Sequence, residues 1–115
     1  MIVAIRDIGG VAVLDLSGKI TRGDGDEVLR ESVDALLAAG RRQIVLNLEK
    51  VPYMDSKGIG ELMAVHTRAA ASGGTVKLLN PLARVYDVLQ LVKLDTVFET
   101  HRDEAVAIAS FHPSA

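Results

Sequence analysis

The sequence contains no cysteine and very few aromatic residues. Without cysteine, disulfides, thiolate metal sites and cysteine nucleophiles are excluded, and an intracellular compartment is expected. Two Phe, two Tyr and no Trp require a core built mainly from aliphatic side chains. A chain of 115 residues can form one core, but no second lobe that would enclose a cleft. These features favour a binding domain over an enzyme.

The sequence also lacks a charge excess and a long hydrophobic run. The sequence has thirteen basic and fifteen acidic residues, and the basic stripe that is typical of nucleic-acid binders is missing. The N-terminal segment has no signal-peptide pattern, and no apolar run approaches the ~20 residues that span a bilayer. We therefore expect a cytoplasmic protein that contacts neither nucleic acid nor membrane directly.

Strand patterns occur in five short segments. The apolar residues 2–5 and 11–16 flank Gly9-Gly10, which predicts an antiparallel hairpin. Residues 44–48 are almost entirely apolar, as in an inner strand covered by helices. Residues 76–79 predict a further strand, and Val97-Phe98 a short strand at the sheet edge.

Helical spacing of apolar residues follows four possible starts. Asp24 or Asp26 would cap the first helix, Asn80 would cap a helix with Pro81 at its first position, and Asp103 would cap the last. Another helix is expected from Ser56 to about Ser72. Glycines mark the ends of the first two helices, namely Gly40 and Gly73-Gly74.

The resulting order β-β-α-β-α-β-α-β-α is that of an α/β domain with a mixed sheet that opens with an antiparallel hairpin. We expect one domain over residues 1–115, with its core at about 2–111 and a flexible tail at 112–115. About four helices are expected.

Known chemical motifs are incomplete in this chain. Gly18-Lys19 lacks both the earlier glycine and the following Ser or Thr of a phosphate-binding loop. Gly58-Ile59-Gly60 opens a helix as a dinucleotide fingerprint would, but Met63 replaces the third glycine. A Ser-His-Asp triad stays open, since its members meet only in space. We predict no metal site, because the three histidines lie on separate elements with no partner at metal-ligand spacing: His66, His101 and His112. We also predict no catalytic residue and no cofactor.

The segment of residues 53–60 allows two interpretations. In the first, Ser56 or Asp55 caps a helix and the glycines let it pack closely on the sheet. In the second, Ser56 is phosphorylated, because a helix N-terminus stabilises a phosphate that adds about −1.5 to −2 charges. Such a dianion would repel an acidic or apolar partner without unfolding the domain.

Residues 44–48, 51–56 and 58–60 together resemble the core signature of STAS domains, and most of all that of bacterial anti-sigma factor antagonists. The resemblance covers nearly the whole chain. It continues through these segments: Gly18-Lys19-Ile20-Thr21, Gly73-Gly74, Leu78-Leu79-Asn80-Pro81, Leu94-Asp95, Val97-Phe98-Glu99, Asp103-Glu104 and Ser110-Phe111.

The resemblance implies a mixed sheet with helices largely on one side and a role in partner switching. The unphosphorylated protein would bind an anti-sigma factor that is also a serine kinase with an ATPase fold, and so release a sigma factor for transcription, for instance in a stress response. Phosphorylation at Ser56 would end binding, and a PP2C-type phosphatase would restore it. The protein would be a monomer or weak dimer. The implied partner-binding residues are Thr21, Asp24, Met54, Asp55, Ser56, Lys57, Gly58 and Ile59.

Two residues depart from the family pattern. Lys57 stands where relatives usually have Ser or Thr, and it could soften the switch or change which kinase accepts Ser56. Lys93 stands where many relatives have Gly, which affects the geometry of a helix end. Two other functions stay open: a STAS subunit of a larger signalling or transport complex, and a small nucleotide-binding domain.

Overall fold

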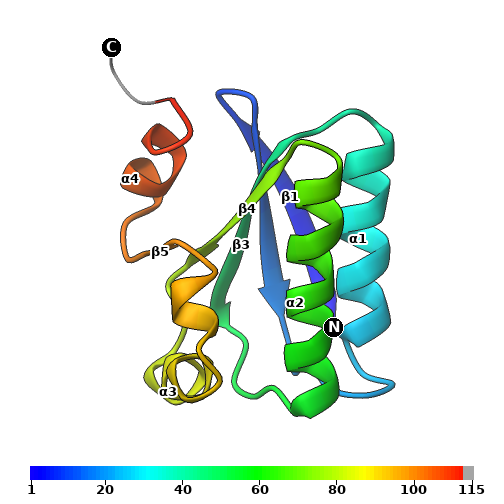
Figure 1. Ribbon diagram of the computed structural model, residues 1–115, viewed down its shortest axis with the longest axis vertical. Coiled ribbons are helices and arrows are strands. Elements are labelled where there is room, and N and C mark those ends of the chain that lie inside the picture. The colour runs from blue at the N-terminus through cyan, green and yellow to red at the C-terminus, as the bar shows by residue number, and fades with distance from the viewer. Residues whose placement is uncertain (113–115) are drawn as a thin grey trace.

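The computed structural model describes residues 1–112, so most of the tail predicted at 112–115 lies outside the described part. Ten elements follow one another along this part (Figure 1). They are β1 (Ile2–Ile8), β2 (Val11–Ser17), α1 (Asp26–Ala38), β3 (Gln43–Lys50), α2 (Ser56–Ala71), β4 (Thr75–Leu79), α3 (Ala83–Leu91), the 3-10 helix η1 (Leu94–Thr96), β5 (Thr100–His101) and α4 (Glu104–Ala109).

The five strands form one mixed sheet in the order β1-β2-β3-β4-β5. The β1–β2 pair is antiparallel and the other three pairs are parallel, which confirms the predicted hairpin and α/β class. Gly9 and Gly10 both have positive φ, 58° and 84°, as the tight hairpin turn requires. The strand predicted to be an inner one, β3, is the central strand of the sheet.

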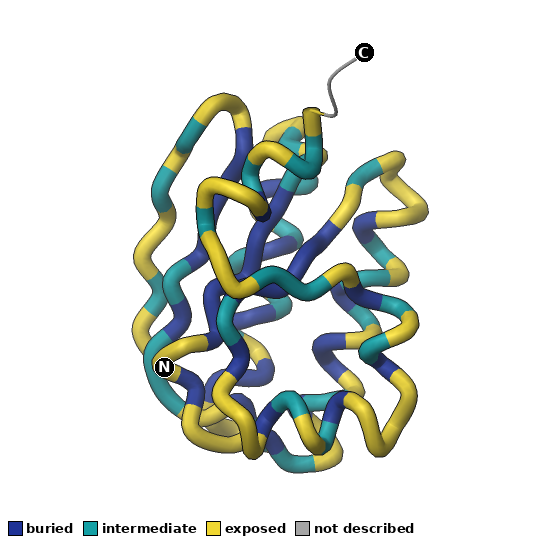
Figure 2. Tube along the Cα trace, turned by 90° about the vertical axis from the view of Figure 1, so that its left-hand side faces the viewer, coloured by how far each residue is buried: buried dark blue, intermediate teal, exposed yellow. Residues whose placement is uncertain are grey.

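Alternating side chains give the sheet two apolar faces. Ala12, Leu14 and Leu16 of β2 point into the main core, which α1, α2 and α3 cover. Val11 and Val13 point to the opposite face, where a smaller cluster packs beneath α4. Most residues of the central strands β2, β3 and β4 are buried, and Figure 2 shows the buried residues gathered in the interior of the molecule. The prediction that the helices lie largely on one side is therefore confirmed.

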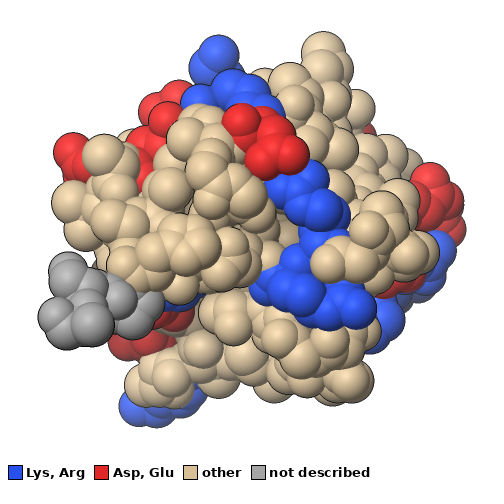
Figure 3. All heavy atoms as spheres, turned by 90° about the horizontal axis from the view of Figure 1, so that it is seen from above, with Lys and Arg blue, Asp and Glu red and all other residues tan. Residues whose placement is uncertain are grey.

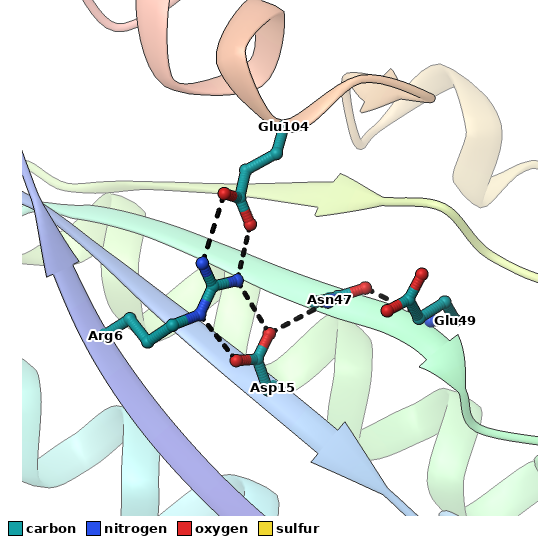
Figure 4. Close-up of polar contacts among 5 residues, drawn as sticks. All are labelled: Arg6, Asp15, Asn47, Glu49 and Glu104. Atoms are coloured by element: carbon teal, nitrogen blue, oxygen red, sulfur yellow. Dashed lines mark hydrogen bonds and ion pairs between the residues drawn. The ribbon is translucent and has the colours of Figure 1, made fainter.

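An ion-pair network connects α4 to the sheet (Figure 4). The Arg6 guanidinium donates to both Asp15 carboxylate oxygens, at 2.6 and 2.9 Å, and also to both oxygens of Glu104 at the start of α4. Asn47 on β3 donates to Asp15 at 2.8 Å. These hydrogen bonds, first of all those from Arg6, hold the pKa of Asp15 below its usual range. Beside the network, the uncovered part of this face forms a groove of about 490 Å³.

Two predicted boundaries around β4 and η1 are wrong. Asn80 has a φ of 51° and cannot cap a helix that starts at the next residue, so α3 begins later, at Ala83, with Leu82 as its N-cap. The pair Val97-Phe98 is not a strand, since η1 ends there and Phe98 is buried in the main core. The edge strand is β5 instead, which pairs with β4.

The cap predicted for α1 is wrong, and the cap predicted for α4 is correct. Neither Asp24 nor Asp26 caps α1, because the N-cap is Gly25, and the Asp26 carboxylate accepts from the Gly23 N–H instead. Asp103 caps α4 as predicted, by accepting from the Val106 N–H. The predicted end of α1 is also correct, since Gly40 adopts a φ of 86°. Within residues 1–112, no helix is long and apolar enough to cross a bilayer.

Candidate functional site

The turn that carries Ser56 lies at the carboxyl end of the sheet. Strands β2, β3 and β4 are parallel, so the segments that follow them meet at one end of the molecule (Figure 1). In open α/β sheets this end is where binding surfaces are built. Here it brings together residues 18–25, after β2, and residues 51–55, after β3.

Backbone hydrogen bonds join these two segments into one unit. The Ile20 N–H donates to the Tyr53 carbonyl at 3.1 Å, and the Asp55 N–H donates to the Ile20 carbonyl at 3.4 Å. Thr21 and Asp24 exchange two backbone hydrogen bonds that close the first loop into a tight turn. Residues more than 30 positions apart are thus held in a fixed relative position.

Asp55 is the N-cap of α2 and also fixes the first loop. One carboxylate oxygen accepts from the Gly58 N–H at 2.8 Å, and the other accepts from the Arg22 N–H at 3.0 Å. These two backbone donors, that of Arg22 first, hold the pKa of Asp55 below its usual range. Of the two caps that the sequence allowed, the structure has Asp55 and not Ser56.

Two glycines permit the close contact between α2 and the first loop. A Cβ atom on Gly58 would overlap the carbonyl group of Ile20, and one on Gly25 would overlap the carbonyl oxygen of Lys19. Gly25 also has a φ of 98°, a backbone conformation that residues with a side chain rarely adopt. The Lys19-Ile20 segment is therefore packed between α1 and α2 with no side chain separating it from either helix start.

Ser56 is the first residue of α2 and is exposed. Its hydroxyl makes no hydrogen bond to another residue within the described part, 1–112, because Asp55 already satisfies the Gly58 N–H. Lys57 beside it is also exposed. The hydroxyl is therefore accessible on a surface whose backbone is fixed by its neighbours.

The remaining predicted partner-binding residues differ in exposure. Asp24 is exposed, Thr21 and Ile59 are half-buried, and the Thr21 hydroxyl donates to the Asp24 carbonyl at 3.3 Å. Met54 is only 6% exposed and packs in the main core, and Gly58 is buried as well. That these two residues contact a partner stays a prediction; in the structure they are buried and position the turn.

Sequence reasoning missed two participants in this site. Arg22 contributes its backbone N–H to Asp55, and any residue except proline could do so, so the sequence carried no signal. Gly25 could have been noticed, since a glycine directly before an amphipathic helix can be the N-cap. Both become evident only once the two loops are adjacent.

Comparisons with known proteins identify the family of this chain. The sequence model of the STAS domain family matches residues 3–107. The anti-sigma F factor antagonist of Paenibacillus polymyxa is 26% identical over 93 residues, which are 78% of this chain and 80% of that protein.

Solved structures show the same fold. The anti-sigma factor antagonist of Mycobacterium paratuberculosis superposes with a TM-score of 0.81 at 23% identity, covering 97% of this chain and 94% of that one. Unphosphorylated SpoIIAA gives a TM-score of 0.75 at 22% identity over 98% of this chain and all of that one. Phosphorylated SpoIIAA of Bacillus gives 0.74 at 23% identity over 96% of this chain and all of that one. The sequence-based recognition is thereby confirmed, and this chain belongs to the STAS domain family.

Proposed function

We propose that this chain is a cytoplasmic anti-sigma factor antagonist that is switched by phosphorylation at Ser56. The unphosphorylated form binds an anti-sigma factor, which is also a serine kinase of the ATPase fold, and thereby frees a sigma factor. The observation that carries the proposal is the accessible Ser56 hydroxyl at the first position of α2, on a turn fixed by Asp55. The names of the relatives and the existence of SpoIIAA in both phosphorylation states support it.

In the switching step the chain is a substrate and not a catalyst. The kinase transfers the γ-phosphoryl group of ATP to the Ser56 oxygen, and ADP and the hydroxyl proton leave. A PP2C-type phosphatase hydrolyses the phosphoserine and returns inorganic phosphate. The helix N-terminus stabilises the added charge, so the fold tolerates the modification.

The added dianion acts on binding through its neighbours. Asp55 is ionised at neutral pH, since its pKa lies below the usual range, and a phosphate on Ser56 adds to that negative charge. A partner that meets this turn with acidic or apolar groups would then face electrostatic repulsion and a strongly hydrated group. Lys57 offsets part of the charge, but an exposed ion pair contributes only ~0–1 kcal/mol.

Three versions of the chain test the proposal in a pull-down from the lysate of the native organism. Wild type and Ser56→Ala are expected to capture a kinase of the ATPase fold, and Ser56→Asp is expected to lose it. Because Asp55 provides the cap, Ser56→Ala is expected to cost less than the ~1 kcal/mol of a lost cap. Equal capture of one assembly by wild type and Ser56→Asp would refute the switch and indicate a subunit of a larger complex.

A further inference from the structure

A small apolar groove lies next to the Ser56 turn. Its volume is about 180 Å³, which is the size of one large aliphatic or aromatic side chain. Residues 52–54 form one wall, and Val85, Val88 and Leu89 of α3 form the other. Arg84 completes the lining and is exposed. The groove is therefore an apolar site with a single cation in its lining.

The groove is continuous with the turn that carries Ser56. Tyr53 lines it, is 53% exposed, and lies three positions before Ser56. The Tyr53 carbonyl accepts the Ile20 N–H, so the same hydrogen bonds that fix the turn also fix this wall of the groove. Figure 1 shows α3 and the start of α2 at the same end of the molecule, with the segment that leads from β3 into α2 between them.

The charges at this end are available for a partner. Within residues 1–112, the side chains of Arg22, Lys57 and Arg84 make no ion pair. The end at which α1 and α2 finish also shows a stripe of Lys and Arg (Figure 3). There, however, Arg41 pairs with Asp7 at 3.1 Å, and Arg42 donates to the carbonyls of Leu37 and Arg41. The cations near Ser56 therefore differ from these in having no internal partner.

We propose that the groove receives an apolar side chain of the anti-sigma factor, adjacent to a carboxylate that pairs with Arg84. The inference rests on the proposed function and names the chemistry of the partner. An apolar or aromatic anchor that fills a small, well-packed pocket is the usual form of a binding hot spot, and complementary charges beside it add specificity. Phosphorylation of Ser56 would weaken this contact, because the phosphate dianion would attract the unpaired cations nearby and repel the partner's carboxylate.

Two variants test the groove against matched controls. Val88→Arg occupies the groove and Arg84→Glu reverses its charge. Two control variants make the same changes elsewhere. Leu91→Arg changes a residue of the same helix that is 81% exposed and lies outside the groove, and Arg30→Glu changes a residue of α1. Affinity for the purified anti-sigma factor is measured by calorimetry. We expect both groove variants to bind at least tenfold more weakly than wild type, and both controls to stay within twofold.

The outcomes separate this inference from the proposed function. Wild-type affinity in Arg84→Glu and Val88→Arg, with Ser56→Asp still unable to bind, would overturn the groove and leave the switch intact. Binding by Ser56→Asp would overturn the switch itself. Arg84 is exposed, so Arg84→Glu remains a valid test if Val88→Arg fails to fold.

A second measurement does not require the protein partner. 3-Phenylpropionate carries an apolar group next to a carboxylate and serves as the probe in an NMR titration of the whole chain. We expect shifts of the methyl signals of Val85, Val88 and Leu89, and their loss in Arg84→Glu. Absence of these shifts in wild type at tens of millimolar probe would contradict the proposed chemistry of the groove.

Discussion

At the residue scale, Gly58 and Gly60 look alike in the sequence but have different roles in α2. A methyl group on Gly58 would overlap the backbone of Ile20, whereas one on Gly60 would meet nothing within 4 Å. We expect Gly58→Ala to lower the free energy of unfolding by about 1–3 kcal/mol through overpacking. Gly60→Ala is expected to raise it by about 0.5–1 kcal/mol, since alanine favours the helix. Urea unfolding of both variants would measure this, and equal effects would contradict the packing argument.

Lys93 carries a conformational cost that a glycine would avoid. Its φ of 67° lies in the left-handed region, just after the end of α3. Asn80, before α3, also has a positive φ, but its short side chain tolerates this conformation better. We expect Lys93→Gly to raise the free energy of unfolding by about 0.5–1 kcal/mol. Lys93→Ala removes the charge but keeps the strain, so it is the control and should give no gain. A similar gain in both variants would point to charge and not to backbone conformation.

At the element scale, α4 is attached to the sheet through the ion pair between Glu104 and Arg6, and Arg6 also forms an ion pair with Asp15 of β2. Since the folded state lowers the pKa of Asp15, this pair contributes its full stability above the ordinary carboxyl pKa of ~3.9. The contribution is lost as the pH falls through the lower, folded-state pKa. We expect Arg6→Met to cost only about 1 kcal/mol at pH 7, because both side chains are partly exposed to solvent.

Unfolding free energies measured between pH 7 and pH 3 would check this assignment. The slope of stability against pH below about pH 5 is expected to be smaller in Asp15→Asn than in wild type. Asp87→Asn on α3 is the control, since within residues 1–112 that exposed carboxylate makes no ion pair. An unchanged slope in Asp15→Asn would show that another carboxylate accounts for the acid sensitivity.

The sequence predicted most elements, and the errors have local causes. Paired glycines and helical spacing located β1, β2, α1 and α2, because these signals depend on neighbouring residues only. Asn80-Pro81 was misread, since an asparagine before a proline fits a helix start as well as a left-handed turn. Phe98 was assigned to a strand because a short apolar pair does not reveal its secondary structure, and here it fills the core beside His66.

The candidate site was predictable in part. Ser56 and Asp55 were found because a cap and its helix are adjacent in sequence. The contact of Asp55 with Arg22 and the groove at α3 join residues about 30 positions apart, and no periodicity indicates such contacts. The same holds for the network of Arg6, Asp15 and Glu104, whose ends are 98 positions apart.

At the scale of the whole molecule, the surface around Ser56 is discontinuous in sequence. It combines residues 18–25, the turn before α2 and the start of α3. We therefore expect the kinase proposed to modify Ser56 to act at least tenfold more efficiently, in kcat/KM, on the folded chain than on a peptide of residues 50–62. Phosphate incorporation from labelled ATP would measure this, with the Ser56→Ala chain as the blank. Equal rates on peptide and chain would show that the kinase reads a linear motif.

The two glycine contacts on either side of Lys19-Ile20 have a consequence for engineering. Because the closest contacts there are with the carbonyl groups of Lys19 and Ile20, the exposed side chains that a partner would encounter carry little of that packing. The packing of these loops thus depends largely on backbone atoms, whereas recognition would depend on exposed side chains. Grafting residues 21–24 together with the solvent-facing positions of the Ser56 turn and of α3 should therefore transfer partner choice between homologous chains, while the sheet and its helices stay unchanged.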